Sequence, residues 1–333
     1  MLGFNEEEFL EQVRSTVALR SQIEELAERV SAGRWKNIYF IGAGGTYAAA
    51  LPYERFFQTR SAFPVRAFIG KEFILAPDPQ FGPDSVAIFA SVSGTTEDIL
   101  DCVEFAREKG ALTVGFTGQA DSPIATAVDE VLLSALKAWP FDVQFLTFGA
   151  KLLSLRGEFD GYDRLVKDLE AIPDALIAVT KQADPIGRAF AEKHADTDYH
   201  FLTGSGQLWG FTYLYSMCIL EEMQWLTTTR VHAAEFFHGS LELIEKDTSI
   251  LVFAGEDETR PLTDRVIAFA KEYSDDVTVI DTKDYELPGV SDEFRGLLAP
   301  IVADAVVDRF SKHLAQVRDH SLDLRRYYRV VAY

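Results

Sequence analysis

The chain has 333 residues, 47% of them hydrophobic and 25% charged, which is typical of a globular protein with a sizeable core. Its 32 basic and 52 acidic residues give a formal net charge of −20, which argues against non-specific nucleic-acid binding and requires a local site for any anionic substrate. The acidic N-terminus is unlike a signal or transit peptide, no apolar run approaches the ~20 residues of a membrane span, and two cysteines are too few for a disulfide framework, so we expect a cytoplasmic protein.

The first half of the chain alternates between predicted strands and helices. An amphipathic helix is predicted over residues 5–33, and further helices over about 46–59 and 95–109. Apolar strands are predicted at Asn37–Ile41, Val65–Ile69, Val86–Ala90, Leu112–Phe116 and Val131–Leu133. Continuous apolar strands that alternate with helices indicate a parallel sheet buried on both faces. Residues 140–194 are predicted to be mostly helical.

The same pattern restarts near residue 199. A strand at Tyr199–Thr203 leads into Gly204-Ser-Gly206 and a long helix to about Trp225, as the strand at 37–41 leads into Gly42-Ala-Gly44 and a helix. This weak repeat predicts two α/β lobes of similar design. The other predicted elements are strands at Ser249–Ala254 and Val277–Ile280, helices at about 258–272 and 301–317, and a tail rich in Arg and Tyr at Arg318–Tyr333.

Two strand ends carry small, hydroxyl-rich loops that open helices: Gly42-Ala-Gly-Gly-Thr46 and Ser91-Val-Ser-Gly-Thr-Thr96. A helix N-terminus offers unpaired N–H groups and a partial positive charge, and glycine lets the backbone approach a ligand closely. In open α/β sheets ligands lie beyond the carboxyl ends of the strands, where both loops fall. The pattern therefore predicts a phosphate site.

Other interpretations of these loops exist. Each loop could be only a tight turn or a helix cap. A Rossmann dinucleotide site is disfavoured, because the third glycine of that fingerprint would fall at Tyr47 and the next strand does not end in an acidic residue.

Three segments carry a resemblance to a known family. Ser91–Thr96 matches the pattern Ser-x-Ser-Gly-x-Thr and resembles the phosphosugar loop of the sugar isomerase (SIS) family. Glu222 lies sixteen residues before His238, within a segment that resembles the isomerase domain of glucosamine-6-phosphate synthase. Gly255–Arg260 and the tail around Arg325-Arg-Tyr-Tyr328 resemble the fructosamine 6-phosphate deglycases of the same family.

The resemblance implies an α/β fold of two doubly wound, parallel-sheet SIS lobes, each a flavodoxin-like three-layer sandwich, with flanking helices and a C-terminal tail. The implied domains are an N-terminal helix at 1–34, a first SIS domain at 35–160, a helical connection at 161–195, a second SIS domain at 196–317 and the tail at 318–333.

The resemblance also implies roles for single residues. Glu222 would be the base that moves a proton between C1 and C2, and His238 would be the acid/base that acts on the sugar oxygens. The residues implied in phosphate or substrate binding are Gly44, Gly45, Thr46, Ser91, Ser93, Thr96, Glu235, His320, Arg325 and Tyr328. From the residues alone, Glu222 could instead be a solvated charge at a helix end, and the tail could be a surface latch.

The chain departs from the synthase in two ways. It shows no glutaminase domain and no N-terminal cysteine nucleophile, since its second residue is Leu2, and its last lysine is Lys312, so the tail lacks the lysine that the synthase uses. We therefore expect its reaction not to be glucosamine synthesis from glutamine.

The sequence-based hypothesis is a fructosamine 6-phosphate deglycase that releases glucose 6-phosphate and an amine, without a cofactor and as a homodimer with shared active sites. No metal, nucleic-acid or membrane partner is expected; His194, His200, His232 and His313 show no metal-ligand spacing. The alternatives are an aldose–ketose sugar phosphate isomerase and a non-catalytic sugar-phosphate regulator. Such a regulator usually adds a DNA-binding helix-turn-helix, which residues 1–35 are too short and acidic to supply.

Overall fold

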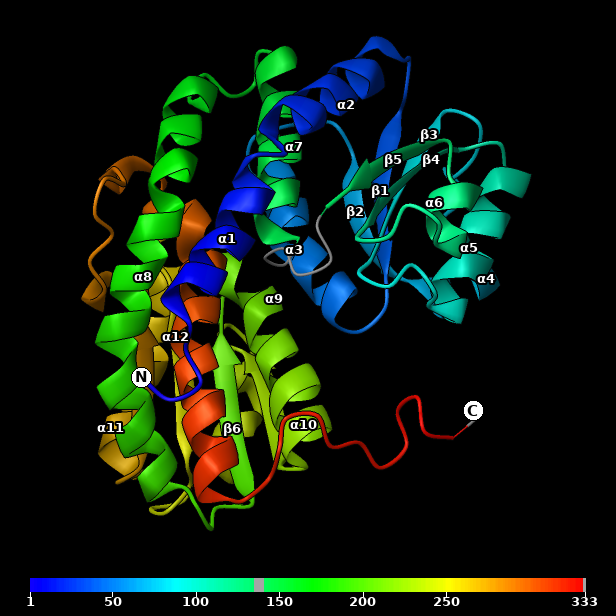
Figure 1. Ribbon diagram of the computed structural model, residues 1–333. Helices are drawn as coiled ribbons and strands as arrows, with labels where there is room; N and C mark the ends of the chain where they lie inside the picture. Colours follow the sequence, from blue (N-terminus) through cyan, green and yellow to red (C-terminus); the bar gives the residue numbers. More distant parts are fainter. Residues whose placement is uncertain (135–140, 332–333) are drawn as a thin grey trace. The chain divides into compact units, whose positions relative to one another are not determined.

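The computed structural model describes residues 1–134 and 141–331 and divides into two compact units. The N-terminal unit is Glu6–Pro173, and the C-terminal unit is Met1–Asn5 together with Asp174–Tyr333 (Figure 1). Helix α8 (Tyr162–Lys193) begins in one unit and ends in the other. No helix among the described residues is both long enough and apolar enough to cross a membrane.

The N-terminal unit is built on a five-stranded parallel sheet of order β2-β1-β3-β4-β5. β1 is an inner strand of this sheet, with β2 paired on one side of it and β3 on the other. The order in which strands are added therefore reverses direction between β1 and β3, as in flavodoxin-like sheets. All the strands predicted here are confirmed: β1 Asn37–Gly42, β2 Val65–Ile69, β3 Ser85–Ser91, β4 Leu112–Thr117 and β5 Glu130–Leu133.

Helices cover both faces of this sheet. On one face Phe40 and Phe116 each contact the ring of Phe145 of α7 at 5.2 Å between centroids. On the other face Phe89 packs in one cluster with Cys102, which is buried and has a free thiol. The first face carries α2, α3 and α7 and the second carries α4, α5 and α6 (Figure 1). Their bounds are α2 Arg20–Ala32, α3 Gly45–Gln58, α4 Gly70–Leu75, α5 Glu97–Glu108, α6 Pro123–Ala127 and α7 Asp142–Leu155.

The C-terminal unit repeats this plan with a four-stranded parallel sheet of order β7-β6-β8-β9. Phe211 of α9 packs on Phe253 from one face, and Phe236 packs on Phe201 from the other. The fold class predicted from the sequence, two doubly wound parallel sheets, is confirmed. The elements are β6 Tyr199–Gly204, α9 Gln207–Leu214, β7 Thr227–His232, β8 Ile250–Ala254, α11 Arg260–Tyr273, β9 Val277–Asp281 and α12 Arg295–Val317.

The internal repeat extends to single backbone angles. Gly44 precedes α3 with φ 56° and ψ −122°, and Gly206 precedes α9 with φ 57° and ψ −129°. Only glycine adopts this region readily. The strand, Gly-x-Gly and helix correspondence read from the sequence is therefore a correspondence in conformation.

Two predicted helices are wrong in their extent. The helix predicted over 5–33 is two helices, α1 (Glu6–Val17) and α2. Just before the break the hydroxyls of Ser15 and Thr16 both donate to the Gln12 carbonyl, and such bonds bend helices. The helix predicted at 301–317 begins earlier, at Arg295, and includes Pro300.

The long helix predicted after Gly206 is interrupted. A π-helical segment, Tyr215–Glu221, follows α9, and a short α10 (Glu222–Gln224) ends at Trp225. Strand β7 was not predicted at all, because its sequence Thr-Thr-Thr-Arg-Val-His has no apolar run and it lies at the sheet edge, half-buried. Its three consecutive β-branched threonines were the available signal.

A buried histidine pair in the C-terminal unit makes stability depend on pH. The His200 side chain is fully buried, its Nδ1 lies 2.9 Å from the Ser249 hydroxyl, and its ring packs 5.2 Å from that of His194. Burial, with smaller contributions from His194 and Arg318, lowers the pKa of His200 to about 3. Burial also lowers the pKa of His194.

Because the folded-state pKa of His200 lies below its unfolded value of ~6.5, neutral His200 favours the fold above that pH, and this stability is lost as the pH falls toward 3. We expect the free energy of unfolding, measured in urea, to fall steeply between pH 7 and pH 4.5. His200→Asn, which can keep the bond to Ser249 but does not titrate, should lose less over that range. An equal loss in wild type and variant would contradict this assignment.

Candidate active site

The two hydroxyl-rich loops lie at the point where the N-terminal sheet changes direction. β1 and β3 are hydrogen-bonded neighbours, so the loops that leave their carboxyl ends are adjacent. Helix α3 begins at Gly45 and α5 at Glu97, so two helix N-termini open at this edge. A strand-order switch with two helix N-termini is a favourable place for a phosphate group.

The Ser91–Thr96 loop is compact and rich in hydroxyls. The hydroxyl of Ser91, which is only 5% exposed, lies 3.1 Å from that of Thr96 and accepts the Gly94 N–H at 3.1 Å. Ser93 and Thr95 pair through their hydroxyls at 2.9 Å. Gly94 has φ 64°, and a Cβ there would lie 2.2 Å from the Ser122 hydroxyl, so the loop requires glycine at this position. The structure thus brings Ser91, Ser93 and Thr96 together.

In the Gly42–Thr46 loop, backbone N–H groups are more available to a ligand than the Thr46 hydroxyl. The Thr46 hydroxyl bonds the N–H and the carbonyl of Ala43, both at 3.1 Å. The N–H of Gly45 donates to no acceptor among the residues that the structure describes. The helix N-termini contribute partial positive charge at this edge, and Glu97 and Asp98 in the first turn of α5 add negative charge beside it.

In the C-terminal unit Glu222 is paired with the tail. Its Oε1 accepts a hydrogen bond from Arg325 Nε at 3.0 Å, and the Glu222 side chain is 29% exposed. The neighbouring Glu221 forms a separate pair with Arg230 at 2.9 Å. Two adjacent carboxylates therefore have different partners, and Arg325 holds the Glu222 carboxylate in one orientation.

The tail is anchored on the turn that follows Glu222. Trp225 has a left-handed backbone, with φ 57°, and its ring contacts both His320, at 4.4 Å, and the Arg326 guanidinium, at 4.1 Å. Gln224 donates to the His320 carbonyl at 3.3 Å. The sequence reasoning missed Trp225 and Gln224 as anchors. Tyr328 is not brought to Glu222; it is exposed and stacks with Arg329.

Glu235 and His238 lie on the segment after β7, and both side chains are exposed. In the described part of the chain neither side chain has a hydrogen bond or ion pair. His238 follows the carboxyl end of β7, whereas Glu222 precedes its amino end. Phe236, two residues before His238, packs on Phe201, whereas α9 and the π-helical segment that leads to Glu222 pack on Phe253 from the other face of the sheet. Glu222 and His238 therefore come from segments on opposite faces of the C-terminal sheet.

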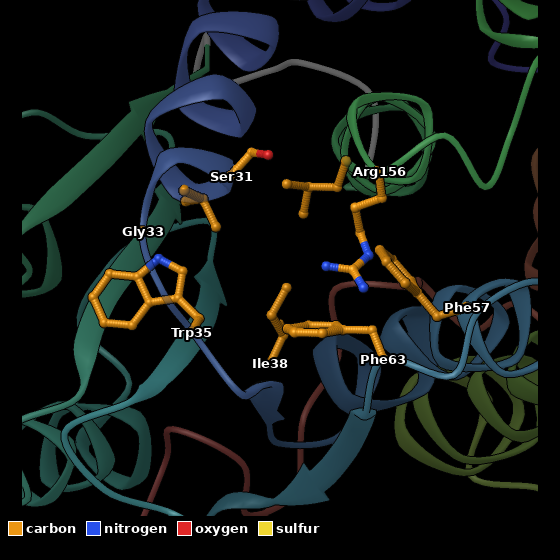
Figure 2. A pocket seen from close by; sticks show the side chains of 9 residues that line it. Ser31, Gly33, Trp35, Ile38, Phe57, Phe63 and Arg156 are labelled. Carbon is orange, nitrogen blue, oxygen red and sulfur yellow. The ribbon is translucent and has the colours of Figure 1, made fainter.

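Two cavities of the N-terminal unit lie away from these loops. One of about 40 Å³ lies near the amino end of β1, where Arg156 stacks on Phe63 at 4.4 Å and Trp35 lies across the cavity from Arg156 (Figure 2). A recess of about 260 Å³ between α1, α2, α7 and α8 is bordered by the Arg20–Glu170 ion pair. Neither includes the loop residues. Across the described ranges, no three His, Cys, Asp or Glu side chains gather as metal ligands.

The chain is similar to known proteins in sequence and in fold. A family profile described as the SIS domain matches residues 33–137. Fructosamine deglycase FrlB of Bacillus subtilis is 29% identical over 96% of this chain and 99% of its own length. Fructoselysine 6-phosphate deglycase of Escherichia coli K12 is 28% identical over 88% of this chain and 85% of its own. A solved candidate phosphosugar isomerase from Bacillus subtilis has a TM-score of 0.89 at 28% identity, over 96% of this chain and 99% of its own.

These similarities cover both sheets, whereas the SIS profile covers the N-terminal unit only. The phosphosugar loop Ser91–Thr96 falls inside the profile match, and the segment from Glu222 to His238 falls inside the longer alignments. The N-terminal unit therefore contains a segment that matches the SIS domain, and the whole chain is similar in sequence to two deglycases and in fold to a solved candidate phosphosugar isomerase.

Proposed function

We propose that this protein is a fructosamine 6-phosphate deglycase that acts in the cytoplasm, needs no cofactor or metal, and has no nucleic-acid or membrane partner. The observation that carries the proposal is the length of the similarity: two deglycases match 88–96% of the chain, including the Glu222–His238 segment and most or all of the C-terminal unit. A likeness confined to the SIS domain would support only sugar-phosphate binding. The proposed domain boundaries are those given above, 1–34, 35–160, 161–195, 196–317 and 318–333.

The reaction balances with water as the only co-reactant. In the open-chain substrate C1 bears the amine and C2 is a ketone, which makes the C1 proton acidic. Glu222 removes that proton to give an enaminol, and reprotonation at C2 gives an imine of glucose 6-phosphate. His238 exchanges protons with the sugar oxygens, a role suited to histidine near neutral pH. Water then adds to the imine, and the C–N bond breaks to release glucose 6-phosphate and the amine.

The placement of Glu222 and His238 supports a homodimer with shared active sites. A base and an acid that serve one substrate must both reach it, within hydrogen-bond distance or through one water. In one chain they come from segments on opposite faces of the C-terminal sheet, and the exposed His238 side chain has no hydrogen bond or ion pair among the described residues. A second copy that supplies His238 would satisfy both requirements.

The experiment that tests the activity is a substrate screen. Fructosamine 6-phosphates with different amines are incubated with the protein, and glucose 6-phosphate is measured as the product. The proposal expects at least one to be cleaved, and the amine that is cleaved fastest identifies the substrate. A screen in which none is cleaved, with sugar phosphate still bound, would favour the regulator alternative.

Ser93→Ala tests the phosphate loop. Hydrogen bonds to charged groups contribute about 1.5–3 kcal/mol, so binding of a phosphorylated ligand should weaken by roughly tenfold or more. The melting temperature should hardly change, because the Ser93 side chain is partly exposed and pairs only within its loop. Calorimetric titration with a sugar phosphate measures the effect. Equal affinity of the wild type for a sugar and its phosphate would refute the site.

A further inference from the structure

The carboxyl edge of the C-terminal sheet has loops placed like the two phosphate loops, but with different side chains. Thr96 is the last residue before α5, and Thr259 is the last before α11; both helices follow the strand on the far side of the switch point. Two residues before each threonine stand Gly94 in one unit and Asp257 in the other. A position without a side chain in the N-terminal unit therefore carries a carboxylate in the C-terminal unit.

The Asp257 carboxylate occupies the place where an anion would bind. One oxygen accepts the N–H of Gln207, the first residue of α9, at 2.7 Å. The other accepts the N–H of Thr259 at 2.7 Å and also its hydroxyl. A Cβ on Gly206 would lie 2.2 Å from the carboxylate, so this glycine admits it. The equivalent N–H in the N-terminal unit, that of Gly45, has no acceptor within the described ranges.

We propose that Asp257 is an internal anion that closes the C-terminal lobe to phosphate, so that each chain binds phosphate at the N-terminal lobe alone. Only the statement about the N-terminal lobe rests on the proposed function. Helix N-termini attract any anion, and a carboxylate tethered in the same loop has a high effective concentration against a free ion. Asp257 is thus a specificity-determining residue, because it places a carboxylate at the N-terminus of α9 where the N-terminal lobe has Gly94, which has no side chain.

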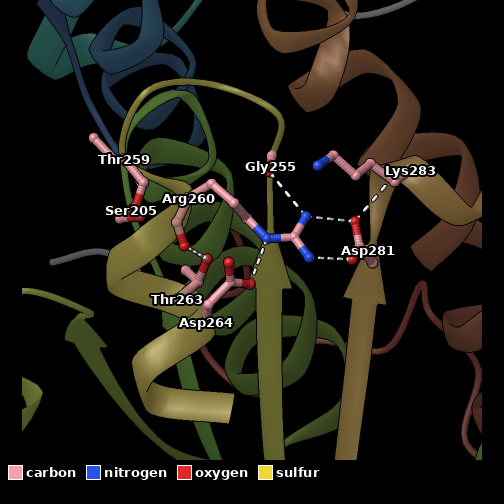
Figure 3. Close-up of polar contacts among 8 residues, drawn as sticks. All are labelled: Ser205, Gly255, Thr259, Arg260, Thr263, Asp264, Asp281 and Lys283. Carbon is pink, nitrogen blue, oxygen red and sulfur yellow. Dashed lines mark hydrogen bonds and ion pairs between the residues drawn. The ribbon is translucent and has the colours of Figure 1, made fainter. Parts of the chain in front are cut away.

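The rest of the loop is held independently of Asp257. The Arg260 guanidinium binds both oxygens of Asp281, at 2.8 and 2.5 Å, and donates to the Gly255 carbonyl at 3.2 Å (Figure 3). Its Nε also donates to Asp264 at 2.6 Å. Removing the Asp257 carboxylate should therefore empty the anion position without unfolding the loop.

The test measures binding of inorganic phosphate by equilibrium dialysis. Wild type should bind about one phosphate per chain, and Asp257→Ala about two, because its helix N-termini become free. Asp257→Ala combined with Ser93→Ala should weaken one of the two sites and leave the other. Asp264→Ala is the matched control: it removes the same charge from an exposed pair with Arg260 and should still bind about one phosphate.

Asp257→Ser, with its shorter side chain, provides a second variant, and melting temperatures with and without phosphate provide a second measurement. Phosphate should raise the melting temperature of both Asp257 variants more than that of wild type. The proposal is overturned if wild type already binds two phosphates, or if neither variant gains phosphate binding or phosphate-dependent stability. If wild type binds none and Asp257→Ala binds one, the N-terminal phosphate site is wrong and the role of Asp257 stands.

Discussion

Glu222→Gln is expected to slow amine release from a fructosamine 6-phosphate by about 10²- to 10⁴-fold, because removal of a general base typically costs that much. The substitution keeps the size of the side chain and an oxygen that can accept from Arg325, so the tail should stay docked on Trp225. The melting temperature and the affinity for a sugar phosphate should therefore stay close to those of wild type. Steady-state rates and thermal unfolding check the two parts.

The adjacent carboxylate supplies the control. Glu221 is ion-paired with Arg230 and accepts from the Thr228 hydroxyl, so it has its own structural partners. Glu221→Gln should lower stability more than Glu222→Gln and activity much less. A Glu222→Gln enzyme with nearly normal turnover, or a Glu221→Gln enzyme with the larger catalytic loss, would show that the base is assigned to the wrong residue.

Mixing two inactive variants should restore activity. If one chain supplies Glu222 and its partner supplies His238, random exchange between Glu222→Gln and His238→Ala chains makes half of the dimers mixed, and each mixed dimer holds one intact site of two. About a quarter of wild-type activity should return in an equal, co-expressed mixture. Each variant alone should be nearly inactive.

The control is co-expression of Glu222→Gln chains with chains that carry both substitutions. In that mixture every site lacks Glu222, so no activity should return. Native mass spectrometry establishes that mixed dimers have formed. Mixed dimers without recovered activity, or a fully active monomer by light scattering at micromolar concentration, would refute the shared sites.

The strand pattern of the N-terminal unit and the Gly44–Gly206 correspondence could be predicted from the sequence, because buried parallel strands leave continuous apolar runs and a glycine-only conformation leaves a glycine. Strand β7 could not be predicted in this way, because an edge strand needs no continuous apolar run. The break between α1 and α2 was not predicted either, because the amphipathic pattern runs through it without a glycine or proline.

The candidate site also has a part that the sequence predicts and a part that it does not. The Ser91–Thr96 loop is local in sequence, so its residue types and spacing were enough to predict a hydroxyl-rich loop between a strand and a helix. The pair of Glu222 with Arg325 joins residues 103 positions apart, and the position of Asp257 over α9 joins residues 50 apart. Such contacts depend on how strands and helices pack, which no local pattern encodes.

The central claim is that the protein cleaves a sugar–amine bond and does not merely isomerise a sugar phosphate. The most direct test compares two initial rates at matched substrate concentrations with the same wild-type enzyme: amine release from a fructosamine 6-phosphate, and interconversion of fructose and glucose 6-phosphates. We predict that amine release is much faster, with glucose 6-phosphate formed in equal amount. Faster isomerisation, or no amine release from any fructosamine 6-phosphate, would contradict the deglycase assignment.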